Sequence, residues 1–214
     1  MFARDRDLLV YEPALFNELS WAGQRLLDGV TAGISGTTLT LLDGDLALAG
    51  IDVGHVLLVD GVAMEVLEVI SATAALVSRV RAESSDTPTS PFGAASDLSV
   101  RCTTFLPQIA LVHEQLMRAL GVDVGATSTV HGRPNASQIT NGRDFVRAES
   151  LGALHVVMTA AAAIAGEDGR WWSKARLYRE RFRDERARVS AEIDLDGDGT
   201  PDATRRFNTM QLAR

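Results

Sequence analysis

The residues best suited to chemistry in this sequence form an acidic loop near its end. Four aspartates, Asp194, Asp196, Asp198 and Asp202, alternate with glycines and small residues there. Carboxylates at alternate positions, with glycine allowing a sharp turn, are typical of the first part of a calcium loop. Arg205 stands where the bidentate glutamate of an EF-hand would follow. The loop therefore predicts either a calcium site or a turn whose carboxylates cap their own backbone amides.

The sequence lacks the familiar motifs of catalytic sites. His113 and Glu114 begin like a zinc-binding HExxH motif, but Met117 occupies the position of the second histidine. The one cysteine, Cys102, excludes an internal disulfide and a cysteine-based zinc cluster. The sequence contains no Gly-x-Ser-x-Gly elbow, Walker loop or dinucleotide fingerprint. We therefore expect a protein that is not an enzyme, with no cofactor apart from the calcium candidate.

A strongly basic segment stands within an acidic chain. Residues 170–188 carry eight basic and three acidic side chains, so this segment has a charge of +5 and the remainder a charge of −12. One interpretation is a solvated helix face with ion pairs such as Arg181 with Glu185. The other is docking onto an acidic surface of a partner or of another copy. On the docking interpretation the binding side chains are Arg176, Arg179 and Arg183.

Length and composition indicate a globular protein. The 214 residues are 46% hydrophobic and 23% charged, which is enough to bury a core without disulfides or metals. No apolar run approaches the roughly 20 residues of a membrane span. Alternating charges near the first residue replace the apolar core of a signal peptide. The sequence thus predicts assembly or function in a cytoplasm, without a membrane.

The first hundred residues carry strand and turn signals. Two apolar runs flank Asp60-Gly61, a dipeptide that supplies the positive φ angles of a type I′ hairpin turn. Residues rich in β-branched side chains predict further strands at 36–41, 73–80 and 98–103. Residues 13–19 are either one helical turn or an extended tie, and residues 83–97 form a loop. Short strands separated by such turns favour a small barrel or sandwich.

The second half of the chain has helical periodicity. Pro107 suits the first turn of a helix and Gly121 its end. Apolar residues recur at intervals of three and four in two further segments, 143–165 and 170–189. Their short Gly-containing connection predicts an antiparallel helical hairpin. A strand, the acidic loop and a second strand complete the chain, whereas residues 121–142 show no apolar repeat.

The predicted fold class is therefore α+β. It comprises a small antiparallel β-barrel or sandwich module plus an antiparallel helical bundle, ending in a C-terminal β-hairpin or extended tail. The predicted boundaries are 1–103 for the β-rich module with its N-terminal tie, 104–190 for the bundle and 191–214 for the hairpin or tail.

The last third of the chain resembles the head-tail connector (adaptor) proteins of tailed bacteriophages. The resemblance lies in the Ala-rich helix 150–165, the break 166–169, the Arg-rich helix 170–189 and the tail 193–199. It implies a compact helical bundle, no catalysis, and assembly into a ring, commonly twelvefold, beneath the portal. It also implies a portal-facing tail, which in this chain contains Arg205, Arg206, Phe207, Gln211 and Leu212.

The leading hypothesis is accordingly a virion neck protein, assembled in the host cytoplasm, that bridges the portal and a neighbouring neck or tail protein. It would bind by surface complementarity, without sequence-specific recognition of nucleic acid. The β-rich segment departs from the smallest, nearly all-helical members, so adaptor, stopper and tail-terminator positions stay open. The alternative is a calcium-dependent binding module whose β-domain recognises a ligand such as carbohydrate. An enzyme using loops 83–97 and 121–142 is a third hypothesis.

Overall fold

The protein consists of two compact units. The computed structural model describes residues 1–83, 85–125, 133–166 and 169–207. Residues 4–106 form one unit, which we call the barrel unit, and residues 1–3 together with those from 107 onwards form the other, which we call the helical unit. The first three residues therefore pack with the helices, whereas the sequence assigned them to the β-rich module.

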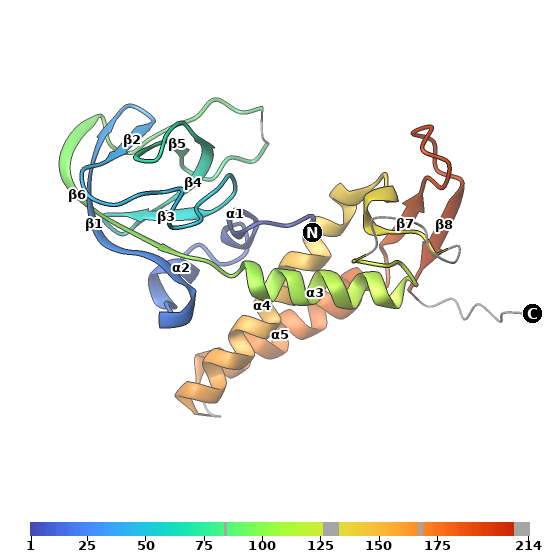
Figure 1. The fold of residues 1–214 in the computed structure, drawn as a ribbon. Helices are drawn as coiled ribbons and strands as arrows, with labels where there is room; N and C mark the ends of the chain where they lie inside the picture. The colour runs from blue at the N-terminus through green and yellow to red at the C-terminus, as the bar shows by residue number, and fades with distance from the viewer. Residues whose placement is uncertain (84, 126–132, 167–168, 208–214) are drawn as a thin grey trace, which may run out of the picture. The chain divides into compact units, whose positions relative to one another are not determined.

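The barrel unit contains a closed antiparallel β-barrel with the strand order β1-β2-β5-β4-β3-β6 (Figure 1). Its strands are β1 (Arg25–Ser35), β2 (Thr38–Leu41), β3 (Val56–Val59), β4 (Val62–Val69), β5 (Ala74–Ser78) and β6 (Ala94–Thr103). Fully buried side chains such as Leu39, Leu57 and Met64 fill its interior. Closure leaves no strand edge unpaired within the barrel. The predicted small barrel or sandwich is thus confirmed as a barrel.

The turn between β3 and β4 has the conformation that its sequence predicts. Asp60 and Gly61 have φ angles of 44° and 79°, and Val59 pairs with Val62 across the turn. A type I′ turn needs positive φ at both central residues, which aspartate tolerates and glycine adopts freely. The other predicted strands are also present, but β6 begins at Ala94 and so takes in the end of the predicted loop 83–97.

The sequence does not predict β1, which pairs with both β2 and β6. Two glycines, Gly29 and Gly33, interrupt its apolar alternation. Its register against β6 shifts between Leu27 and Val30 and again between Ala32 and Ile34. Such bulges bend a strand around a barrel, and a glycine with positive φ, as at Gly29, accommodates the bend. The interruptions that hide the strand are therefore what lets it close the barrel.

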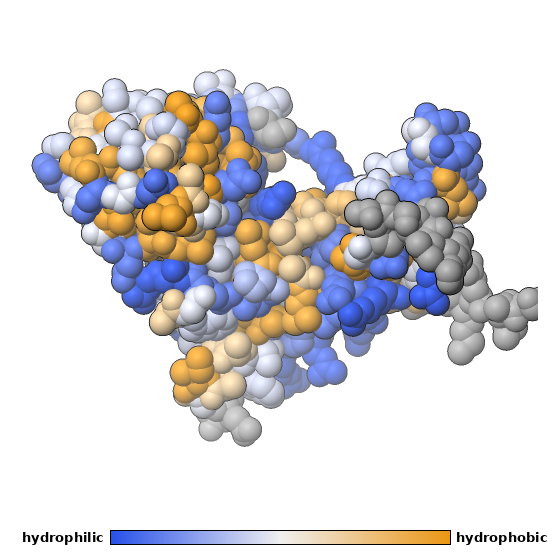
Figure 2. Space-filling view, viewed as in Figure 1, coloured by the Kyte–Doolittle hydropathy of each residue, from blue (hydrophilic) through white to orange (hydrophobic). Residues whose placement is uncertain are grey.

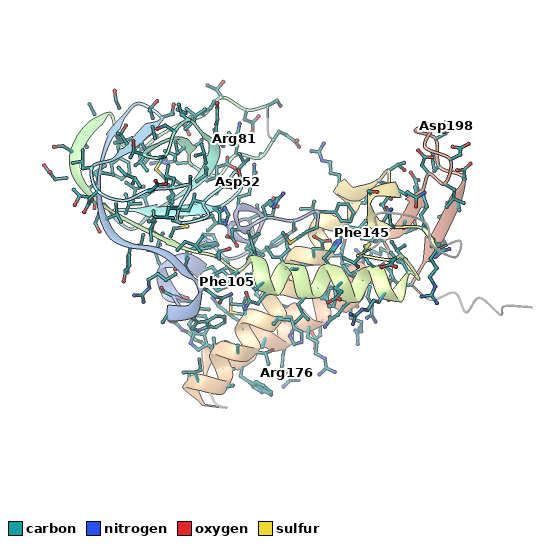
Figure 3. All side chains as sticks on the ribbon, viewed as in Figure 1. Asp52, Arg81, Phe105, Phe145, Arg176 and Asp198 are labelled. Carbon is teal, nitrogen blue, oxygen red and sulfur yellow. The ribbon has the colours of Figure 1, made fainter. Side chains whose placement is uncertain are left out.

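Short helical segments precede the barrel strands. They are α1 (Asp5–Leu9), α2 (Leu15–Glu18) and the 3₁₀ turn η1 (Ala22–Gln24). For residues 13–19 the structure thus shows the helical turn rather than the extended tie. Phe105, labelled in Figure 3, packs against two aromatic side chains from this part of the chain. Phe16 on α2 lies with its ring centroid 5.2 Å from that of Phe105, and Trp21 meets the same ring edge-on at 5.7 Å.

The helical unit contains the three predicted helices and the predicted C-terminal hairpin. Its elements are α3 (Leu106–Ala119), η3 (Ala136–Gln138), α4 (Gly142–Ala165), α5 (Arg170–Arg186), β7 (Ser190–Ile193) and β8 (Ala203–Arg206). Strand β7 pairs antiparallel with β8, as the predicted hairpin requires. Gly121, with a φ of +68°, follows α3 as the sequence predicts.

The three helices pack closely around Gly152 of α4. A side chain there would lie 2.6 Å from Val112 on α3 and 3.0 Å from the ring of Phe182 on α5, so only glycine fits. Helices α4 and α5 run side by side (Figure 1). By length and composition α4 could span a membrane, but 61% of its apolar stretch is buried within the protein, as in the core helix of a folded unit.

Candidate functional site

A stripe of arginines on α5 forms the first candidate site. Arg176, Arg179 and Arg183 follow at intervals of three and four residues, so they share one face of the helix. This face borders the buried stripe that contains Ala175 and Tyr178. The arginine stems therefore start at the rim of the α5 packing surface, while their guanidinium groups are exposed to solvent.

The arginines line a groove to which all three helices contribute. Gln115 from α3 and His155 from α4 form part of its wall, and its volume is about 550 Å³. His155 is half-buried, and its Nδ1 donates to the carbonyl oxygen of Ala175 at 3.1 Å. This backbone partner fixes the imidazole in the wall. The sequence had indicated neither Gln115 nor the place of His155 beside α5, because both depend on how the helices pack.

The groove is strongly basic. Arg176, Arg179, Arg183 and Arg186 line it against a single acidic residue, Glu180. Within the ranges the structure describes, Arg176 and Arg179 form no ion pair. Figure 3 shows Arg176 reaching out from the helices. The groove is therefore suited to a carboxylate-rich or otherwise anionic surface.

The other interpretation of the basic segment is a solvated helix face with ion pairs along α5, and the ion pairs in the structure differ from those predicted. The sequence paired Arg181 with Glu185 along α5, but Glu185 lies 3.1 Å from Arg147 of α4. That contact joins two helices instead of neutralising the arginine stripe. Arg183 does lie 3.3 Å from the adjacent Asp184, in a solvent-exposed pair, which contributes little.

An exposed tryptophan adjoins the basic groove. Trp172 is 44% exposed, whereas Trp171 is buried at 9%, as their positions on the helix predict. Trp172, Thr159 and His155 line a second groove of about 490 Å³, which shares Arg176 and Arg179 with the first. Tryptophan beside arginine is the composition of binding hot spots in protein interfaces.

Apolar side chains also reach the surface elsewhere on α4 and α5. Ile164, one residue before the end of α4, is 77% exposed, and Leu177 on α5 is 42% exposed. Figure 2 shows hydrophobic side chains at the surface where α4 ends. Ile164 and Trp172 add apolar contact area to the exposed surface of the helix pair. Leu177 is five residues from Trp172 and so lies on another face of α5.

The predicted tail residues have contacts within the helical unit. Arg205 donates to the carbonyl oxygens of Leu120 and Gly121, at 3.0 and 2.8 Å, and so binds the C-terminal end of α3. Phe207 packs against Phe145 with ring centroids 6.3 Å apart. Arg206 is exposed on β8. Gln211 and Leu212 lie outside the described residues.

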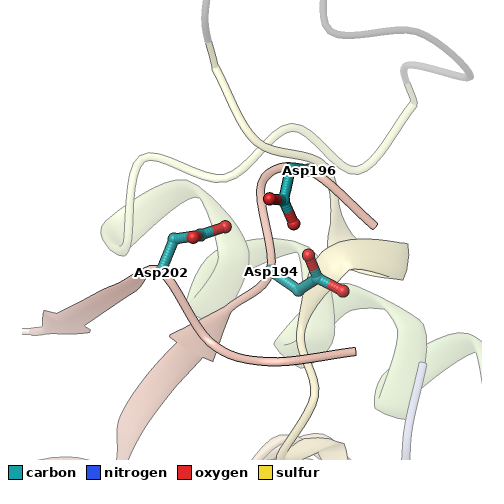
Figure 4. Close-up of side chains that lie close together, drawn as sticks. All are labelled: Asp194, Asp196 and Asp202. Atoms are coloured by element: carbon teal, nitrogen blue, oxygen red, sulfur yellow. The ribbon is translucent and has the colours of Figure 1, made fainter. Parts of the chain in front are cut away.

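The acidic loop between β7 and β8 brings three of its four predicted carboxylates together. One oxygen from each of Asp194, Asp196 and Asp202 lies within 4.8 Å of the others (Figure 4). Asp198 is not in this group, and its Oδ1 accepts from the backbone N–H of Thr200 at 2.7 Å. The spacing of the three oxygens suits a hard cation such as Ca²⁺.

The same carboxylates also cap the backbone of the loop. Gly197 and Gly199 donate their N–H groups to Asp194 at 2.6 and 2.8 Å, and Leu195 donates to Asp202 at 2.7 Å. The amides of Gly199 and Gly197 hold the pKa of Asp194 below its ordinary value. Self-capping is thus realised, as one of the two sequence interpretations expected.

Three fully buried carboxylates, Glu149, Glu65 and Asp5, went undetected in the sequence. In the helical unit, Glu149 accepts from the backbone N–H groups of Phe2 and Ala3, at 2.9 and 2.7 Å, and from Nδ1 of His113 at 2.6 Å. The ring of Phe2 lies over Gly142, where any side chain would overlap it. The failed HExxH motif thus supplies a histidine that helps to hold the first residues against α3 and α4.

In the barrel unit, Glu65 lies 2.7 Å from a guanidinium nitrogen of Arg6 and 2.8 Å from one of Arg81. Asp5 is also fully buried, and its Oδ1 accepts from the backbone N–H of Phe105 at 2.8 Å. Burial raises the pKa of Asp5 to about 6, although its bonds from Thr104 and Phe105 act in the opposite direction. These groups tie α1 to the barrel and offer no open reaction site.

Comparisons of this chain with protein-family models, with curated proteins and with solved structures found no match.

Proposed function

We propose that the protein is a structural neck component of a tailed-phage virion, a head-tail adaptor that joins the portal to a neck or tail protein as one member of a ring. The observation that carries this proposal is the arginine groove on α5, with exposed Trp172 beside it. A charged groove with an aromatic neighbour favours binding to a protein surface.

The helical unit fits the architecture that the resemblance implies. Val112, Gly152 and Phe182 bring α3, α4 and α5 into one contact, which we interpret as the centre of a small helical bundle. The resemblance covers α4, α5 and the acidic loop, and α4 and α5 supply the lining residues of the basic groove apart from Gln115. The barrel unit is then an addition to the helical architecture, and it extends the surface available to neighbours in the ring.

Each part of the helix pair would have its own role. The apolar residues Trp172 and Ile164 supply the desolvated contact area that gives an interface most of its affinity. The arginines supply orientation and association rate, because charged groups steer one surface toward another of opposite sign. We assign Trp172 to the contact with the portal and the arginine groove to an acidic neighbour in the ring.

Binding to portal-bearing capsids tests this function. Cosedimentation of the purified chain with capsids of the phage or prophage that carries the gene should show saturable binding. Trp172→Ala should weaken binding roughly tenfold or more, as for a hot-spot residue. Leu177→Ala, an exposed apolar residue on another face of α5, is the matched control and should change binding little. A chain that ignores the capsids would refute the proposal.

The acidic loop favours a second candidate, a calcium-dependent binding module whose barrel recognises a ligand such as carbohydrate. Its support is the convergence of Asp194, Asp196 and Asp202. Calorimetric titration with Ca²⁺ should give heat that disappears in Asp196→Ala, which removes a carboxylate and leaves the caps from Asp194 intact. No heat at millimolar Ca²⁺ would exclude this candidate.

A further inference from the structure

The surface of the barrel unit is acidic and thus opposite in sign to the groove on α5. Residues 4–106 contain fourteen acidic and six basic side chains. Two of the basic ones, Arg6 and Arg81, pair with buried Glu65 and contribute little to the exterior. Nine acidic residues and four arginines of this unit are exposed. The barrel therefore presents excess negative charge to any neighbour.

Two of the exposed carboxylates are fixed at the same level of the barrel wall. Asp43 accepts from the backbone N–H of Thr31 at 2.6 Å, and Asp60 accepts from that of Ser99 at 2.8 Å. Thr31 and Ser99 are paired partners on β1 and β6. The carboxylates therefore flank the β1–β6 pair at a separation on the order of 10 Å. We call this region, with exposed Asp97 on β6, the acidic wall.

The arginine stripe matches this wall in length and chemistry. Arg176 and Arg183 are seven residues apart, which corresponds to about 10 Å along a helix. Guanidinium groups bind carboxylates through paired N–H donors. Backbone bonds already hold Asp43 and Asp60, so less conformational entropy is lost when they bind than for free side chains.

We propose that the α5 groove of one copy binds the acidic wall of a second copy. Groove and wall lie on different units, so each copy offers one of each and the contact is head-to-tail. Repetition of such a contact closes into a ring or extends into a filament, depending on the rotation between copies. Closure of these contacts into a ring rests on the proposed function. The contact between two copies is argued from charge and geometry alone.

Charge-reversal variants test the contact directly. In the groove variant, Arg176→Glu and Arg179→Glu make the groove acidic. In the wall variant, Asp43→Asn and Asp60→Asn keep the backbone acceptors, and Asn also tolerates the positive φ at position 60. The wall variant also carries Ser99→Lys, which adds a positive charge at an exposed position between buried Leu98 and Val100.

Sedimentation velocity at low salt and rising concentration provides the measurement. The wild-type chain should self-associate, and added salt should weaken its association because exposed charges are screened. Each variant alone should associate roughly tenfold more weakly or worse, since like charges then face each other. Mixing the two variants should restore association, because every groove then meets a wall of opposite sign.

The matched control for the groove variant makes the same change in charge at two arginines outside the groove. Arg181→Glu with Arg188→Glu alters two exposed arginines outside the groove lining and should leave association within about threefold of wild type. Circular dichroism and thermal melting confirm which variants retain the fold. A wild-type chain that stays monomeric, or a mixture no stronger than its components, would overturn the proposal.

The outcome also separates this contact from the neck function. A chain that self-associates by these rules but ignores portal-bearing capsids keeps the head-to-tail contact and loses the proposed function. A chain that binds capsids without association between copies keeps the proposed function and loses the head-to-tail contact.

Discussion

Each unit buries one carboxylate that holds part of the chain's beginning, but the two carboxylates have different partners. Glu65 of the barrel unit lies between the guanidinium groups of Arg6 and Arg81. Glu149 of the helical unit accepts from backbone amides of Phe2 and Ala3 and from His113. Arginines remain charged at any pH at which proteins fold, whereas backbone amides contribute only dipoles.

The difference teaches how each unit tolerates a buried charge. In the barrel the carboxylate is compensated by full opposite charges, so its loss would leave two cations in a poorly hydrated place. In the helical unit two of the groups that bind it are backbone amides, so its loss would leave buried donors unsatisfied. Removal of the barrel carboxylate should therefore be the more damaging.

The largest effect is expected from Glu65→Gln. The substitution removes the buried counter-charge that Arg6 and Arg81 share, and their side chains are 18% and 13% exposed. Arg6 keeps a longer contact of 3.6 Å to Asp7. Breaking a buried pair in this way costs about 3–5 kcal/mol of unfolding free energy, to be measured by urea denaturation. Glu68→Gln, an exposed change on the same strand, is the control and should be nearly neutral. Equal stability of the two variants would contradict the assigned role.

The pH dependence of the barrel unit depends on Asp5. Its folded pKa of about 6 lies above the ordinary value of 3.8, so the folded state holds this proton more tightly. The stability from Asp5 is complete below about pH 4 and is lost as the pH rises through about 6. Asp5→Asn keeps an acceptor for Phe105 and should gain about 3 kcal/mol relative to wild type between pH 4 and pH 7. A stability difference that is independent of pH would exclude this mechanism.

A smaller loss is expected from Glu149→Gln in the helical unit. The amide oxygen of glutamine can replace part of the acceptor capacity that Phe2, Ala3 and His113 now use. We expect a loss of about 2 kcal/mol, the range for unsatisfied buried donors. Glu114→Gln, a change to a half-buried side chain on α3 that pairs with exposed Arg118, serves as the control in the same urea experiment. A loss equal to that of Glu65→Gln would remove the distinction between the two units.

The smallest effect tests how Phe2 is seated. Gly142→Ala places a methyl group where the Phe2 ring lies, and displacement of that ring should cost about 1–2 kcal/mol. In Phe2→Ala the same substitution should cost much less, because the space is then free. A double-mutant cycle measures this coupling. Gly23→Ala, at a site with nothing within 4 Å, is the control, and additive effects would show that the ring does not lie there.

The candidate sites were predictable only in part. The arginines of α5 and the aspartates of the loop stand close together in the sequence, so their helical or turn spacing places them on one face or in one loop. The walls of the groove were not predictable, because Gln115 and His155 come from other helices. Glu149 is 147 residues from Phe2, its partner, and no local pattern indicates such a pair.

The sequence by itself determined the features that depend on near neighbours. They include the type I′ hairpin at Asp60-Gly61, the limits of α3 and the helical hairpin of α4 and α5, because turn chemistry, caps and apolar periodicity act over a few residues. Only the tertiary structure decided that β1 bulges and pairs with β6 to close the barrel. It also decided that residues 1–3 join the helical unit and that the acidic loop gathers three carboxylates. These features arise from contacts between distant segments, whose free energy is gained only when the whole unit packs.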